Sequence, residues 1–357
     1  MHDFPTFRLI WQTAAMIAFG ALGGFVATLA HVPMPWMLGG LLSSALVILI
    51  WAPPFLKDYD FPLPFRTGFV ALIGVMIGTQ VTADLLAMAG QLPWTMGGLV
   101  VFVICAHLGN TFIFRRLGGY DRATAFYSGT PGGLMESIVM GEGAGADIRI
   151  LTAQQFLRII VVITLLPLCL SLWMGTPVGS AAGLPAASGH APVAPQALVL
   201  IGLAAGLGLW LARLIRLPAA QLSGPMILAA LATTTGVLDL HLPIWLIAAA
   251  QLVIGVSLGM RFKGTNLALL RRCAWLALVS VVFMLVLGGV LSAILWQITG
   301  IEWLHLLISF SPGGVAEMSV VALSLAANPA LVGLHHVARI LMTVVELSVM
   351  ARLLGLR

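Results

Sequence analysis

The sequence predicts an all-α polytopic membrane protein, and three observations favour this fold class. Of the 357 residues, 60% are hydrophobic and only 8% are charged, whereas a typical soluble domain has about 25% charged residues. The mean hydropathy is +1.07. Apolar segments near the roughly 20 residues that a helix needs to cross a bilayer recur along the whole chain. This composition argues against a soluble enzyme, a DNA-binding regulator and a disordered protein.

The charged residues also favour a membrane protein. The net charge is +5, but the basic residues are spread thinly between apolar segments and form no run of five or more. Cytoplasmic loops that follow the positive-inside rule explain this balance better than a nucleic-acid surface does. The cysteines Cys105, Cys169 and Cys273 lie in or at the edge of apolar segments without metal-ligand spacing, so no disulfide framework is expected.

The apolar segments form two series separated by an uncharged linker rich in Gly, Ala, Pro and Ser. The first series is expected at 8–30, 35–51, 66–82, 93–114, 124–143 and 148–174, and the second at 196–215, 219–238, 243–260, 274–297, 304–327 and 330–353. The first segment is too long for a signal-peptide core and is expected to remain as a span. This pattern predicts an N-terminal membrane repeat over 1–175, an extracytoplasmic linker over 176–195 and a C-terminal membrane repeat over 196–357.

The two series are related by duplication. At an offset of 181, Pro131-Gly132-Gly133 matches Pro312-Gly313-Gly314, Glu136 matches Glu317, and Arg158 matches Arg339. No gap is needed over about 90 residues of this match, and nearer the start the offset becomes 185. Chance does not easily place these residue types at one offset, so the sequence predicts an internal repeat.

Loop charges predict that the repeats are inverted. Loop 115–122 holds three arginines while its counterpart holds Glu302, and loop 83–92 holds Asp84 while its counterpart holds four basic residues. Two related halves that face opposite ways across one membrane produce this reversal. We therefore expect five crossings per half, with 124–143 and 304–327 entering and leaving on one side. Both termini are then cytoplasmic.

The Pro-Gly-Gly segments predict broken or re-entrant helices. Proline removes a backbone donor and clashes with the preceding turn, and each glycine costs about 1 kcal/mol in a helix. Unwound backbone inside a membrane needs cover from protein or a water-filled cavity. Helix ends at such breaks present amides that suit an anion. A simple helix kink is the alternative, but the duplication favours a binding site.

Charged residues inside the apolar segments extend this candidate site. Glu136 and Glu317 follow the breaks by one turn, and each half has one arginine near mid-membrane, where a charge usually marks a pathway or a pair. Ion pairs of Glu136 with Arg158 and of Glu317 with Arg339 would instead stabilise only the fold. His335, Arg339 and Glu346 lie on one helix face and are candidates for proton or ion coupling. The candidate solute- or ion-binding residues are Ser128, Thr130, Gly132, Gly133, Glu136, Arg158, Ser309, Ser311, Gly313, Gly314, Glu317, His335, His336, Arg339 and Glu346.

Three motifs resemble a known family. Val-Pro-x-x-x-x-Leu-Gly-Gly at 32–40, Gly-Thr-Pro-Gly-Gly-Leu-x-Glu at 129–136 and Ser-Pro-Gly-Gly-x-x-Glu-Met at 311–318 look like the AbrB-type membrane protein family. That family has been labelled as ammonia monooxygenase and as transcriptional regulator, and it is similar to the cation/proton antiporter and anion transporter superfamily with its inverted five-helix repeats. The resemblance implies a bacterial inner-membrane location, but no agreed substrate.

The sequence predicts a secondary transporter of a small solute, with an anion as one candidate class, coupled to H⁺ or Na⁺. The alternative is a membrane-embedded regulator or sensor that affects gene expression without transport. No enzyme motif, metal-ligand cluster or soluble basic module is present, so we expect no catalysis, no cofactor and no nucleic-acid partner. The expected partners are the lipid bilayer, the solute and the coupling ion, and a homo-oligomer is compatible with the sequence.

Overall fold

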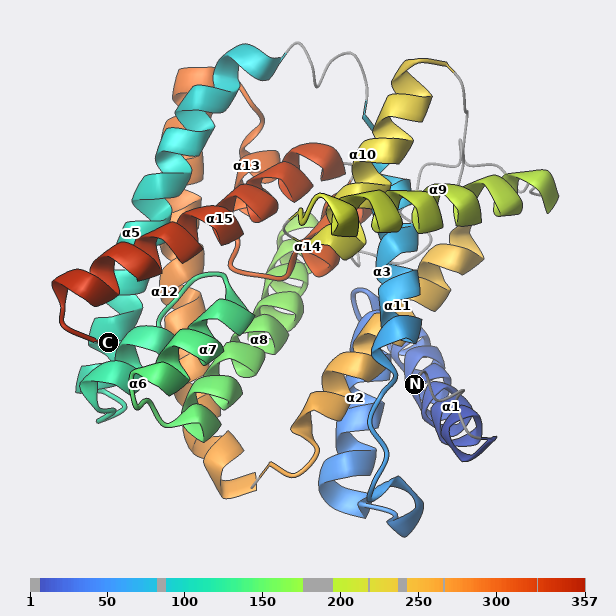
Figure 1. Cartoon of the computed structure of the whole chain (residues 1–357), viewed down its shortest axis with the longest axis horizontal. Coiled ribbons are helices and arrows are strands. Elements are labelled where there is room, and N and C mark those ends of the chain that lie inside the picture. Colours follow the sequence, from blue (N-terminus) through green and yellow to red (C-terminus); the bar gives the residue numbers. More distant parts are fainter. Residues whose placement is uncertain are drawn as a thin grey trace. The chain divides into compact units, whose positions relative to one another are not determined.

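The computed structural model describes residues 7–81, 88–175, 195–217, 219–236, 243–265, 267–325 and 327–356, and all regular structure in these ranges is helical (Figure 1). Apart from Pro195, the predicted linker lies outside the described residues, as do Asp84 and Asp239. Within these ranges, seven helical spans are long and apolar enough to cross a membrane. They fall in α1 (Phe7–Leu29), α5 (Leu92–Arg116), α8 (Ile148–Met174), α9 (Pro195–Leu214), α11 (Ile244–Gly259), α12 (Leu267–Thr299) and α15 (Pro329–Leu353).

The chain forms two compact units, and each combines parts of both sequence halves. Unit 1 comprises Met1–Val81, Leu166–Thr265 and Leu323–Ala326. Unit 2 comprises Thr82–Leu165, Asn266–Ala322 and Ala327–Arg357. The boundary after Val81 recurs after Thr265, 184 residues later, which is close to the offset of the sequence repeat. Each unit therefore takes corresponding pieces from the two halves.

In unit 1 the helices of the two halves pack on one another through glycines. The unit holds α1, α2 (Pro35–Leu46), α3 (Leu63–Gly78), α9, α10 (Ala220–Thr234) and α11. Helix α3 packs on α10, and its counterpart α11 packs on α2. A Cβ added at Gly74 or Gly78 would lie 2.5 Å or 2.3 Å from a backbone oxygen of α10. The same addition at Gly255 or Gly259 would lie 2.2 Å or 2.5 Å from a backbone oxygen of α2.

The sequence motifs Gly74-x-x-x-Gly78 and Gly255-x-x-x-Gly259 predict close helix packing, and these contacts confirm it, since only a residue without a side chain permits such an approach. The same kind of contact also occurs twice, once for each half of the duplicated sequence. Each Gly-x-x-x-Gly helix lies against the second helix of the other half, so the two contacts are equivalents of each other.

Unit 2 repeats one succession of helices. The first half supplies α5, α6 (Arg122–Ser128), α7 (Leu134–Gly143) and most of α8, and the second half supplies α12, α13 (Trp303–Phe310), α14 (Val315–Ser324) and α15. Each series is a long helix, two short helices and a second long helix. The short helices are separated by residues 129–133 in one half and 311–314 in the other, which are the Pro-Gly-Gly segments. We call these two interruptions break 1 and break 2.

Candidate functional site

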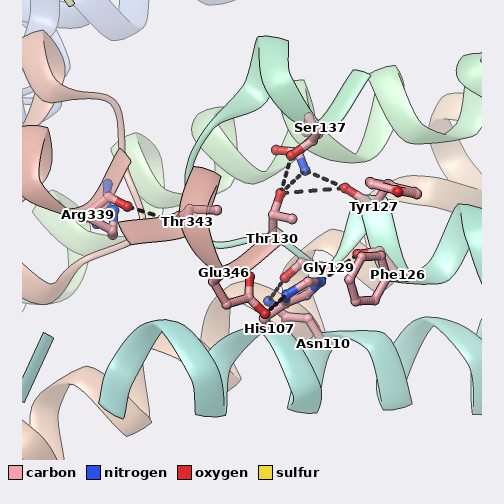
Figure 2. Close-up of polar contacts among 11 residues, drawn as sticks. His107, Asn110, Phe126, Tyr127, Gly129, Thr130, Ser137, Arg339, Thr343 and Glu346 are labelled. Atoms are coloured by element: carbon pink, nitrogen blue, oxygen red, sulfur yellow. Dashed lines mark hydrogen bonds and ion pairs between the residues drawn. The ribbon is translucent and has the colours of Figure 1, made fainter. Parts of the chain in front are cut away.

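Break 1 lies at the C-terminal end of α6, where helix geometry leaves carbonyl groups without partners. Two residues of α5 supply donors to it (Figure 2). His107 Nε2 donates to Phe126 O over 2.8 Å, and Asn110 Nδ2 donates to Gly129 O over 3.1 Å. The hydroxyl of Ser280 on α12 donates to Asn110 Oδ1 and fixes that amide in turn.

Helix α8 supplies the remaining donors to break 1. Gln155 Nε2 lies 3.1 Å from Tyr127 O, 3.3 Å from Ser128 O and 2.7 Å from the Thr130 hydroxyl. The guanidinium of Arg158 donates to Thr130 O. Together with the α5 donors, these contacts serve five consecutive carbonyls, from Phe126 to Thr130. Unwound backbone is thus satisfied by protein, as a membrane interior demands.

Break 2 receives two hydrogen bonds from the side chain of Arg339, which lies on another element. Arg339 on α15 donates through Nη1 to Ser311 O and through Nη2 to Gly313 O, the latter over 2.6 Å. Ser311 and Thr130 are equivalent positions in the two halves, so Arg339 and Arg158 perform the same task. Because carbonyl groups at the C-terminal end of a helix carry partial negative charge, each arginine balances one helix end.

Helix α15 also brings break 1 against break 2. A Cβ added at Gly132 would lie 3.2 Å from Thr343 Oγ1 and 3.6 Å from Arg339 Nε. Thr343 itself donates to the carbonyl of Arg339, one turn earlier (Figure 2). Arg339 therefore contacts the second interruption with its Nη atoms while its Nε lies beside the first. The two breaks meet at this residue.

The two arginines are buried charges without a counter-ion. Arg158 is 6% exposed and Arg339 is 2% exposed. None of the ion pairs among the described residues includes either of them, and the Nε of each has no hydrogen-bond partner. No Glu136–Arg158 or Glu317–Arg339 ion pair forms in the part of the chain that the structure describes, so the arginines are not neutralised in the way that the sequence alternative required.

The side chain of each glutamate instead lies next to the break that precedes it in the chain. Each lies in the first turn of the helix that follows, where a carboxylate is favoured by the helix dipole. A Cβ at Gly314 would lie 2.0 Å from Glu317 Oε2, and a Cβ at Gly133 would lie 3.5 Å from Glu136 Oε2. Glu317 is buried and Glu136 is half-buried.

The histidines and hydroxyls of the predicted site make contacts within their own helices. Nδ1 of His335 and of His336 lies 2.8 Å and 2.9 Å from a carbonyl one turn earlier, and their Nε2 atoms have no partner. Because a carbonyl only accepts, Nδ1 carries the hydrogen and Nε2 is a buried acceptor. Ser309 and Ser311 donate to carbonyls of α13, while the Ser128 hydroxyl is buried without a partner.

Glu346 pairs with a residue that sequence reasoning left out. His107 Nδ1 lies 2.6 Å from Glu346 Oε1; the His107 side chain is fully buried and the Glu346 side chain is 9% exposed. The sequence placed Glu346 with His335 on one face of a helix and gave His107 no role. A signal was present, because the positions equivalent to His107 and Glu346 are Gly288 and Leu165. His107 therefore has no polar counterpart in the second half, and Glu346 has none in the first.

The loop before α6 contains the residue that caps this helix. Asp121 caps α6 by accepting a hydrogen bond from the Thr124 amide over 2.9 Å. Partial burial raises the pKa of the Asp121 carboxyl, but hydrogen bonds from Thr124 and from nearby backbone amides outweigh it and hold the pKa below its usual value. Burial raises the pKa of Tyr120 beside it. No group of three or more His, Cys, Asp and Glu side chains gathers as a metal site among the described residues.

Comparison with known proteins identifies the family. The family model described as "Transition state regulatory protein AbrB" matches residues 42–355. The chain belongs to the AbrB family. It is 24% identical over 353 residues to "Uncharacterized protein YhjN" of Bacillus subtilis (strain 168), which covers 95% of this chain and 92% of the relative. It is 25% identical over 332 residues to "Putative regulator AbrB" of Escherichia coli (strain K12), with 91% and 90% covered. The predicted AbrB-type resemblance is confirmed over most of the chain.

Proposed function

We propose that this AbrB-family chain is a secondary transporter of a small anionic solute, coupled to H⁺ or Na⁺, with its solute site where breaks 1 and 2 meet. The observation that carries the proposal is the pair of buried arginines, Arg158 and Arg339, without a counter-ion. A buried charge is costly unless it is paired. A bound anion would supply the missing charge and use the unpartnered Nε atoms.

The chemistry of the donors favours a carboxylate or phosphate. A guanidinium presents a planar fork that matches the oxygens of either group, and it remains charged at any physiological pH. Each arginine donates hydrogen bonds to backbone carbonyls through Nη atoms and keeps an Nε without a hydrogen-bond partner. Broken helices that contribute both a site and a point of bending are typical of secondary transporters.

The surrounding molecule supports a membrane setting. Large apolar side chains are exposed along the long helices, for example Trp11 on α1, Leu172 on α8 and Trp275 on α12. In a bilayer these side chains would face lipid. The architecture we propose has five crossings in each inverted half. The short helices on each side of a break form the non-crossing or re-entrant part. The chain lies in a bacterial inner membrane, with both termini in the cytoplasm.

Uptake into vesicles tests this function. The purified full chain is reconstituted into proteoliposomes, and labelled monocarboxylates, dicarboxylates, amino acids and phosphate are offered under an imposed pH or Na⁺ gradient. We expect saturable uptake of one anion class that Arg158→Gln and Arg339→Gln abolish, while Arg116→Gln, at an exposed position on α5, leaves it unchanged. Absence of uptake across the panel with folded protein would contradict the proposal.

A regulatory function without transport is the second candidate. The names of the family and of one relative, which describe regulators, are the observation that favours it. It predicts that Glu136→Gln and Glu317→Gln leave a gene-expression phenotype intact while altered cytoplasmic loops abolish it. A transporter whose solute acts as a signal predicts the reverse, because the glutamates lie at the breaks.

A further inference from the structure

We propose that His107 and Glu346 form a proton-binding site, that it is the coupling site of the transporter, and that the coupling ion is H⁺ rather than Na⁺. This inference rests on the proposed function for its coupling role, but the proton site itself stands on the geometry of α5, α6 and α15. His107 is fully buried, and the Glu346 side chain is 9% exposed.

The hydrogen bonds of His107 fix how many protons the pair holds. Its Nε2 lies 2.8 Å from Phe126 O, and a carbonyl only accepts, so Nε2 carries a hydrogen. Its Nδ1 lies 2.6 Å from Glu346 Oε1, a distance that needs a hydrogen between the two atoms. The pair is therefore either imidazolium with carboxylate or imidazole with carboxylic acid. Both forms are neutral overall and share one further proton.

Release of that proton changes both charge and contact. The products are a neutral imidazole that keeps Nε2–H, a Glu346 carboxylate and one proton that passes to water. Two lone pairs then face each other across Nδ1 and Oε1, and a negative charge is left buried without a partner. The 2.6 Å contact is lost, and Glu346 needs a new donor. Its Oε2 is already buried without one.

The position of the pair allows a change in its protonation to affect both breaks. His107 holds Phe126 O, the first of the five carbonyls at break 1. Glu346 lies on α15 seven residues, about 10 Å, after Arg339, which holds break 2 and lies beside Gly132. Figure 2 shows His107 and Glu346 in contact beneath Thr130 and Gly129. Separation of the pair would release α15 from α5 at the level of break 1.

The surrounding charges favour a site that can exchange its proton. Arg339 is a fixed positive charge two turns from Glu346 on the same helix, so it offsets the charge of the deprotonated pair. Helix α5, which carries His107, packs on α6, α12 and α15, and α15, which carries Glu346, also packs on α13. The other titratable or charged groups on these five elements are Cys105, Arg115, Arg116, Arg122, Tyr127, Arg271, Arg272, Cys273, His305, His335, His336 and Arg352.

The ligand chemistry of the pair favours H⁺ over Na⁺. Sodium, like other hard cations, prefers several oxygen ligands, whereas this site offers one imidazole nitrogen and one carboxylate. The pair also occurs once per chain, because Gly288 and Leu165 occupy the equivalent positions. The proposal therefore specifies one proton site in each chain.

Infrared difference spectroscopy on the full chain in liposomes tests the proton site without a solute. Spectra are compared between acidic and alkaline pH. We expect a one-proton change in imidazole and carboxyl bands that Glu346→Gln and His107→Gln each remove. Glu302→Gln is the matched control, since Glu302 pairs with His305 over 3.6 Å but is 70% exposed. A spectrum that the Glu346 and His107 variants leave unchanged would overturn the proton site.

Proton flux tests the coupling. A pH-sensitive dye is enclosed in the proteoliposomes, and the anion panel is offered without a Na⁺ gradient. We expect the wild-type chain to move protons with the solute, and Glu346→Gln to lose gradient-driven uptake while it retains exchange of labelled for unlabelled solute. Proton flux that persists in Glu346→Gln overturns the coupling role, as does uptake that requires Na⁺.

The outcomes separate the two proposals. If no anion enters the vesicles, the proposed function fails while the infrared titration still decides whether the pair holds a proton. The double variant His107→Leu/Glu346→Leu guards against misfolding, because it removes both partners and leaves no buried charge behind. It is expected to fold and to lose the titration. A folded double variant that keeps the one-proton change would place the proton elsewhere and overturn the site.

Discussion

Breaks 1 and 2 have the same sequence pattern but are held in different ways. Break 1 receives side-chain donors from four residues on two helices, whereas Arg339 on α15 donates to two carbonyls of break 2. Gln155 serves three acceptors at break 1, while its counterpart His336 bonds within its own helix. Break 1 is therefore the more strongly fixed of the two, and break 2 is the better candidate for movement.

The largest expected effect comes from the arginines. Arg339→Met removes a charged donor from two carbonyls and is expected to lower the free energy of unfolding by about 3 kcal/mol. Arg158→Met removes it from one carbonyl, with Gln155 and Asn110 still holding break 1, and is expected to cost about half as much. Chemical denaturation of the detergent-solubilised chain measures both values. Equal costs would contradict the difference between the breaks.

An exchange of counterparts sharpens the comparison. Gln155→His leaves up to three acceptors at break 1 without their donor, and we expect a loss of about 2 kcal/mol in unfolding free energy. The reciprocal His336→Gln brings a donor to the helix face that supports break 2, where Nε2 now has no partner. We expect a gain of about 1 kcal/mol and slower transport. The same denaturation assay applies, and a destabilised His336→Gln would argue against a loosely held break 2.

The backbone of break 1 gives a smaller effect. Gly133 has φ of +59°, in the left-handed region that side chains disfavour. Gly133→Ala is expected to cost about 1 kcal/mol, and Gly133→Asn less, because asparagine tolerates this conformation. Thermal unfolding of the two variants side by side provides the measurement. An alanine variant as stable as wild type would show that break 1 relaxes more easily than its hydrogen bonds indicate.

The helix caps before the breaks give the smallest effect. Asp121 caps α6, whereas its counterpart Glu302 makes no side-chain cap on α13. Asp121→Ala is expected to cost about 1 kcal/mol and Glu302→Ala much less. Because the pKa of Asp121 is lowered in the folded chain, its contribution is present above the unfolded pKa and is lost as pH falls through the folded pKa.

Acid titration checks that sign. The wild-type chain should lose more stability than Asp121→Asn between about pH 5 and about pH 2, since asparagine keeps the cap without titrating. If both chains lose the same stability as the pH falls, the titration of Asp121 is not the cause of the loss.

Much of the helical organisation could be predicted from the sequence, because its signals are local or repeated. Hydropathy predicted the long helices, and the 181-residue offset predicted that Arg158 and Arg339 hold equivalent places. The Gly-x-x-x-Gly motifs predicted close packing, which the contacts of Gly74 and Gly255 confirm. Ten crossings and the inverted orientation stay predictions, as do the repeat boundaries.

The partners of the site residues could not be predicted, because they depend on which helices meet. An ion pair of Glu136 with Arg158 was one alternative, yet the arginine donates to Thr130 O instead. His107 lies 239 residues from Glu346, and only their absence from the other half pointed to the pair. No sequence signal distinguished Gln155, although it contacts three acceptors at break 1.

The central claim is that the buried arginines at the two breaks bind an anion. Isothermal titration of the purified full chain with carboxylates, phosphate and sulfate tests it most directly, with Arg158→Gln and Arg339→Gln compared against Arg116→Gln. We predict saturable binding of one anion class to wild type and to the Arg116 variant, and none to either buried-arginine variant. Binding that survives in both buried-arginine variants, or an absence of binding to folded wild-type protein, would contradict the account.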